Sequence, residues 1–155
     1  MRINPKAKVT CLVALAMALL PLTHTQARAL NDEKPFAEKH VIMQVSRGDG
    51  ARQGLVLDIA NNLAKHYGGQ DMVDVEIIAF GAGVPIVFAD NNPNQARVQS
   101  LMAHGVRFYV CGNTLDTLER RDGDRPELLP GVETVQTGVA FMIDEVDRGY
   151  THVHP

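Results

Sequence analysis

The residue best suited to covalent chemistry is Cys111, which ends the segment 106–111 and is followed at once by Gly112, Asn113 and Thr114. The segment is rich in β-branched and aromatic residues, a composition that predicts a buried strand. Asn113 or Thr114 can cap a following helix with its side-chain oxygen. Ligands of open α/β sheets bind beyond the carboxyl ends of the strands, and N–H groups at a helix start favour a thiolate over a thiol. We therefore predict that Cys111 is the catalytic thiol and that Gly112, Asn113 and Thr114 bind a ligand beside it.

Residues 1–29 have the pattern of a secretory signal peptide. Basic residues precede the apolar run 9–22, and Ala27-Arg28-Ala29 has the small-x-small form of a signal-peptidase site. We expect cleavage after Ala29 and export of the mature protein to the periplasm or its equivalent. The apolar run is shorter than the roughly 20 residues of an ordinary membrane span, and no later segment approaches that length.

Cleavage would leave Cys111 as the single cysteine, because the other one, Cys11, lies in the leader. Exported proteins usually pair their cysteines. An unpaired cysteine can be a reactive thiol, or it can be a small buried hydrophobic residue with only a packing role. The residue pattern leaves both interpretations open.

The charge balance excludes some partners. Without the leader, 11 basic and 18 acidic residues remain, a formal net charge of −7. An acidic chain without a basic run is not expected to bind nucleic acid or an anionic membrane surface. The remaining 126 residues are enough for one compact domain and too few for two.

Strand-like and helix-like segments alternate, which predicts parallel βαβ units and an α/β fold: a three-layer α/β/α sandwich around a parallel sheet of about five strands. Residues 30–38 form an expected flexible arm and 39–155 the domain. Expected strands are 39–45, 73–80, 106–111, 132–135 and 150–155, and expected helices are 51–67, 92–105 and 137–148.

Two helix faces and two loops complete this prediction. The first helix should bury Leu55, Ile59, Leu63 and Tyr67, with Val56 and Ala60 beside them on the same face. The last helix should bury Val139, Met142, Ile143 and Val146. Gly81 and Gly83 follow a strand and are candidate ligand-binding residues. The charged segment 119–130 is expected to be a surface loop near the thiol.

No metal site or cofactor is predicted. His152 and His154 fall on one face of a strand, but nothing in the sequence completes a ligand set around them. Flavodoxin-like cofactor binding would rest on fold analogy alone.

Several blocks together resemble the DsrE/DsrF-like family, specifically its exported members. They are Gly81-Ala-Gly-Val84, the segment 101–108, Cys111-Gly-Asn-Thr-Leu115, Leu129-Pro-Gly-Val132, Gly138-Val139 and the terminal segment from Gly149. The resemblance covers nearly all of the mature chain, from about His40.

This resemblance implies a parallel α/β sandwich that assembles into homotrimers or hexamers, and a cysteine that carries sulfur as a persulfide. Two functions remain open. In the first, Cys111 exchanges sulfur with a donor or acceptor protein or a small sulfur compound, as a sulfurtransferase-like carrier. In the second, the protein is a non-enzymatic ligand-binding or scaffold module in which Cys111 is structural.

Overall fold

The computed structural model describes residues 31–155, so the predicted signal peptide and Cys11 lie outside the described residues. Five strands alternate with helices. The strands are β1 (Lys39–Val45), β2 (Val73–Ala79), β3 (Arg107–Cys111), β4 (Glu133–Val135) and β5 (Thr151–Val153). The helices are α1 (Gly50–His66), the 3₁₀ helix η1 (Gly81–Val87), α2 (Gln95–Ala103), α3 (Gly112–Asp122) and α4 (Gly138–Arg148).

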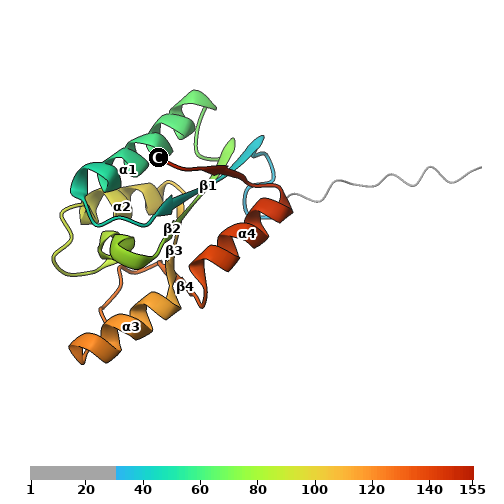
Figure 1. Ribbon diagram of the computed structural model, residues 1–155. Coiled ribbons are helices and arrows are strands. Elements are labelled where there is room, and N and C mark those ends of the chain that lie inside the picture. Colours follow the sequence, from blue (N-terminus) through green and yellow to red (C-terminus); the bar gives the residue numbers. More distant parts are fainter. Residues whose placement is uncertain (1–30) are drawn as a thin grey trace, which may run out of the picture.

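The strands form one parallel sheet in the order β4-β3-β2-β1-β5. Helices α1 and α2 lie on one side of the sheet and α4 on the other (Figure 1). The predicted parallel α/β/α sandwich is therefore confirmed. Because all strands run the same way, the loops after β1, β2, β3 and β4 meet at one edge.

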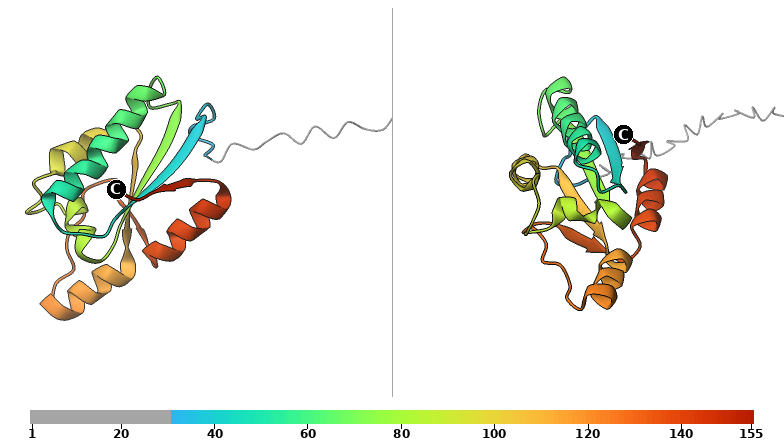
Figure 2. Two further views of the ribbon diagram at one scale, coloured as in Figure 1. Left: turned by 45° about the horizontal axis from the view of Figure 1, so that its top comes forward. Right: turned by 60° about the vertical axis from the view of Figure 1, so that its left-hand side comes forward.

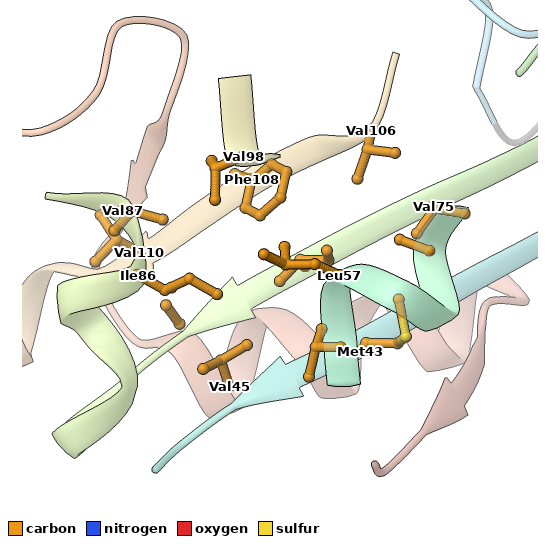
Figure 3. Packing of buried hydrophobic residues seen from close by; sticks show 14 of the residues in the cluster. Met43, Val45, Leu57, Val75, Ile86, Val87, Val98, Val106, Phe108 and Val110 are labelled. Carbon is orange, nitrogen blue, oxygen red and sulfur yellow. The ribbon is translucent and has the colours of Figure 1, made fainter. Parts of the chain in front are cut away.

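The main core lies between the sheet and the α1/α2 layer. Figure 3 shows Leu57 of α1 and Val98 of α2 close to sheet residues such as Met43 and Phe108. These side chains are fully buried or nearly so. The predicted inward face of α1 is largely confirmed, because Val56 and Ala60 are buried and Ile59, Leu63 and Tyr67 pack partly buried against the core. Leu55 is 46% exposed, so its predicted burial is wrong.

The α4 layer differs from its prediction at three of four positions. Met142 faces inward as predicted, and together with Phe141 it packs against Ile42, Ile78 and Tyr109 of the sheet. Three other apolar residues of α4 face outward, with exposures of 45% at Val139, 53% at Ile143 and 41% at Val146. The helix carries apolar residues on two sides, and the side with the larger aromatic ring and the methionine is the buried one.

Helix α3 starts one or two residues earlier than its predicted caps. It begins at Gly112, so Cys111 itself occupies the N-cap position, and Asn113 and Thr114 lie in the first turn. Its charged end includes residues 119–122, which were expected in a loop. The following segment is held in place by backbone bonds to 87–89, and Leu129 is buried.

The arm expected to be flexible is hydrogen-bonded to the domain, including a bond of 2.9 Å from the Glu38 N–H to the Met72 carbonyl. Asn31 donates a hydrogen bond to Asp74 over 3.1 Å, and the Lys34 ammonium donates to the Val73 carbonyl over 3.2 Å. Within residues 31–155, no helix is long and apolar enough to cross a membrane.

Candidate functional site

The site forms where the loop after β3 meets the loop after β4. Cys111 is paired with Val135 in the register of these two strands, so residues 112–114 and 136–138 continue side by side. The Asn113 N–H donates to the Gln136 carbonyl over 3.0 Å. The first turns of α3 and α4 consequently lie together at this edge of the sheet (Figures 1 and 2).

Cys111 is more enclosed than the sequence predicts. The residue is 7% exposed, whereas a partly exposed thiol was expected. Its sulfur lies 3.7 Å from the Gln136 carbonyl oxygen, to which the thiol donates a weak hydrogen bond. The enclosure arises because the start of α4 packs directly on the end of β3. Among the described residues, Cys111 is the one cysteine, and it is free.

Glycine at position 138 permits this close packing. A Cβ atom at Gly138 would lie 3.1 Å from the Cys111 Cβ and 3.3 Å from the Ile78 side chain. Both distances are tighter than ordinary carbon contacts. A side chain at this position would move the first N–H groups of α4 away from the sulfur.

The surroundings favour the thiolate. Burial raises the pKa of the Cys111 thiol, but the Gly138 N–H, the Thr114 hydroxyl and N–H and the Asn113 N–H stabilise the charged sulfur, and together they hold the pKa below its usual value. The Asn113 amide is the weakest of these contributors, as expected for an N–H already bonded to Gln136. The sulfur thus receives donors from the starts of two helices, α3 and α4.

The loop after β2 completes one side of the site. The Gly81 N–H donates to the Thr114 hydroxyl oxygen over 3.1 Å, and Gly81 has a φ of 56°, which favours glycine. This bond leaves the Thr114 hydroxyl proton free to point at the sulfur. Gly83 lies elsewhere: it is buried, and a Cβ there would be 2.1 Å from the Val45 carbonyl oxygen.

A set of polar side chains fastens the two helix starts to each other. The Gln136 amide donates to the Asn113 side-chain oxygen over 2.8 Å, and the Asn113 amide donates to the Thr137 hydroxyl over 3.1 Å. Gln136 also contacts Asp116 at 3.3 Å, which in turn accepts from Arg125 at 2.7 Å. The Asn113 side chain therefore bonds the neighbouring loop.

The structure thus gathers Cys111, Gly112, Asn113, Thr114 and Gly81, all of which the sequence predicts. Sequence reasoning missed Gln136, Thr137 and Gly138 as site residues. Their signals are the Gly138-Val139 block of the family resemblance and a Thr-Gly pair at a helix start after a short strand. These signals point to Cys111 only once β4 is known to neighbour β3.

A second polar cluster lies on the α4 face of the sheet, nearer the amino ends of the strands. The Arg107 guanidinium is 2.8 Å from both Asp74 and Glu76. Asp74 also accepts from Tyr150 and Asn31. Both carboxylates are fully buried, so the cluster contributes to the stability of the fold and presents no reactive group to solvent.

In residues 31–155, no three His, Cys, Asp or Glu side chains lie close enough together to hold a metal ion. His152 and His154 have ring centroids 6.2 Å apart. The reactive group that the site presents is the Cys111 sulfur, with hydrogen-bond donors around it.

Comparisons with known proteins agree with this fold. The sequence model of the DsrE/DsrF-like family matches residues 39–155. The structure of a protein of unknown function, MTH1491 from Methanobacterium thermoautotrophicum, is similar with a TM-score of 0.67 and 28% identity, over 76% of this chain and 100% of that one. The ychN protein from E. coli is similar in fold, with a TM-score of 0.58 and 16% identity over 76% and 99% of the two chains. A comparison with curated proteins gave no match.

Proposed function

Because the chain belongs to the DsrE/DsrF-like family, which is associated with sulfur metabolism, we propose that Cys111 carries sulfur as a persulfide. The observation that carries the proposal is the convergence of donors from α3 and α4 on a single thiol, which lowers its pKa. A thiolate is the nucleophile of sulfur exchange, so a lowered pKa increases the reactive fraction at neutral pH.

The proposed exchange is a displacement at sulfur. The Cys111 thiolate attacks the outer sulfur of a persulfide R–S–SH, forming a new S–S bond with its own electron pair. The S–S bond of the donor breaks, and R–S⁻ leaves with both electrons of that bond. An acceptor thiolate later attacks the outer sulfur of Cys111–S–SH, and Cys111 leaves as the thiolate. The Gly138 and Thr114 donors stabilise it in both directions.

We expect inorganic polysulfide to add one sulfur atom to the native protein, because Cys111 is 7% exposed and a small reagent can reach such a residue more readily than a bulky one. Intact-mass analysis would detect the adduct. Cys111→Ser should abolish the adduct and keep the fold, since serine is nearly isosteric. The adduct should disappear on reduction, as a persulfide does.

Thr114→Val is a more demanding comparison. It removes the hydroxyl next to the sulfur but keeps the shape and the cysteine. We expect about threefold slower adduct formation near neutral pH, because a rise of one unit in the thiol pKa lowers the thiolate fraction by up to about tenfold but makes the thiolate about threefold more nucleophilic. Addition of sulfur at an unchanged rate would contradict the proposed role of these donors, and an adduct that survives in Cys111→Ser would overturn the proposed function.

The enclosure of Cys111 favours a second candidate. A cysteine of 7% exposure also fits a non-enzymatic small-ligand-binding or scaffold module in which the thiol only packs. The same experiment separates the two. A native protein that takes up no sulfur, and whose Cys111 reacts only after unfolding, would be such a module.

We also propose that the protein acts after export, on the basis of the leader pattern at 1–29. Its partner would then be a donor or acceptor protein, or a small sulfur compound, outside the cytoplasm. The intact mass of exported protein should correspond to a chain that begins at Leu30.

The protein is further proposed to form a homotrimer or hexamer, with the outward side of α4 in the interface. Val139, Ile143 and Val146 make an exposed apolar stripe at helical spacing, which water solvates poorly. We expect Ile143→Glu to dissociate the oligomer, as measured by light scattering at micromolar concentration. Leu55→Glu is the matched control, because Leu55 is similarly exposed on α1, across the sheet. A wild-type monomer would contradict this proposal.

A further inference from the structure

We infer that Asn113, Gln136 and Thr137 are positioning residues that clasp the start of α4 against Cys111. This inference deepens the proposed function and rests on it for its biological meaning. It concerns how the site is held together, and its geometry is independent of whether sulfur is the cargo.

The start of α4 lies beyond the end of β4, so no strand pairing holds it in place. Strand β4 ends at Val135, and the next three residues must turn to place Gly138 beside the sulfur. The backbone bond from Asn113 to Gln136 joins the two loops at one point. The side-chain bonds from Asn113 to Gln136 and Thr137 add two more.

The Thr137 side chain does not cap its own helix. Thr137 is the N-cap residue of α4, a position where a threonine normally accepts a bond from its own helix. Here it makes no such cap bond and instead accepts from Asn113. The Thr137 hydroxyl is thus committed to Asn113 and not to its own helix, whereas the Asn113 N–H of α3 is already engaged by the Gln136 carbonyl.

The clasp therefore controls how closely the α4 donors approach the thiolate. Without it, the start of α4 is held by the backbone bond, by the longer contact of Gln136 with Asp116 and by packing around Gly138. Loosening by even a few tenths of an ångström would weaken the Gly138 contact, which is the largest of the stabilising contacts at the sulfur. Asp116, which contacts Gln136, also pairs with Arg125 at 2.7 Å, and Arg125 pairs with Glu119 at 3.0 Å.

The test compares thiol titrations. Asn113→Ala removes both clasp bonds, and Thr137→Val removes one with little change of shape. The ultraviolet absorbance of the thiolate is followed against pH, with the Cys111→Ser protein as the blank, so no reagent needs to enter the site. We expect the midpoint to rise by about one unit in Asn113→Ala, which lowers the thiolate fraction by up to about tenfold at a pH below both midpoints, and by less in Thr137→Val.

Two controls make the result specific. Thr117→Val removes another hydroxyl of α3, which donates a hydrogen bond to the Asn113 backbone carbonyl and has no hydrogen bond to residues 136–138. This variant should leave the midpoint unchanged. Thr137→Ser keeps the hydroxyl and should restore the wild-type midpoint. Unchanged midpoints in Asn113→Ala and Thr137→Val, or an equal shift in Thr117→Val, would overturn the inference. A protein that takes up no sulfur but shows the expected shifts would refute the proposed function alone.

Discussion

Arg107→Met is expected to lower the free energy of unfolding by about 3 kcal/mol, because breaking a buried ion pair leaves an uncompensated charge inside the protein. Arg107 Nη2 lies 2.8 Å from Asp74 and 2.8 Å from Glu76, and neither carboxylate has measurable contact with solvent. Methionine retains much of the length of the side chain, so the loss reports mainly on charge. Urea unfolding followed by circular dichroism would measure it.

A double-mutant comparison isolates the charge from the packing. Asp74→Asn removes the anion, and in Arg107→Met with Asp74→Asn the stranded charge is absent. The double variant should therefore lose less stability than the sum of the two single variants. Strict additivity would show that the pair has no energetic coupling. Exposed pairs such as Arg121 with Asp122 should contribute far less, because water screens them.

The fold could be predicted from the sequence, because glycines and other turn residues bound the apolar segments that predict its strands. The first strand was predicted over 39–45 and is found there, since the apolar run is bounded by a charged arm and by a Ser-Arg-Gly turn. Proline and glycine end the other elements close to their predicted positions. Helix propensity is the weaker signal at 119–122, where α3 continues through a charged sequence supported by buried Leu115.

The wrong face of α4 has a different cause. Val139, Ile143 and Val146 form one apolar stripe on this helix, and Phe141 and Met142 lie on the other side. That other side includes Glu145, which is buried and bonded to Arg148. A pattern based on hydrophobicity assigns the outside to the stripe with the glutamate. The structure reverses this assignment, because Phe141 fits against Tyr109 with ring centroids 4.5 Å apart.

Part of the candidate site could be predicted from the sequence, and part depends on the order of the strands in the sheet. Cys111 to Thr114 are consecutive, so their proximity needs no knowledge of the sheet. The approach of Gly138 depends on β4 being the neighbour of β3, which is a property of strand order. The low pKa of the thiol was predicted from α3 alone, and the structure adds α4 as a contributor.

The buried cluster around Arg107 also explains an unusual carboxyl. Burial raises the pKa of Glu76 from its ordinary 4.5 to about 8, while Arg107 opposes this rise, Glu145 and Asp74 support it and Arg148 opposes it. Asp74 behaves in the opposite way. Burial raises its pKa as well, but the Tyr150 hydroxyl, Arg107 and Asn31 outweigh burial and lower it. One guanidinium thus neutralises one carboxylate, and the second carboxyl keeps its proton.

Glu76 should therefore make the protein less stable as pH rises through the neutral range. Between its ordinary pKa of 4.5 and about 8, the folded protein holds a proton that the unfolded chain has released. Unfolding then releases this proton, so each unit of pH costs at most about 1.4 kcal/mol of stability. Above about pH 8 this loss is complete and the dependence becomes flat. Glu76→Gln is neutral at every pH, so it should flatten the decline and exceed the wild type in stability near pH 8. Urea unfolding from about pH 5 to about pH 8 measures both slopes, and equal slopes would show that Glu76 is ionised in the folded protein.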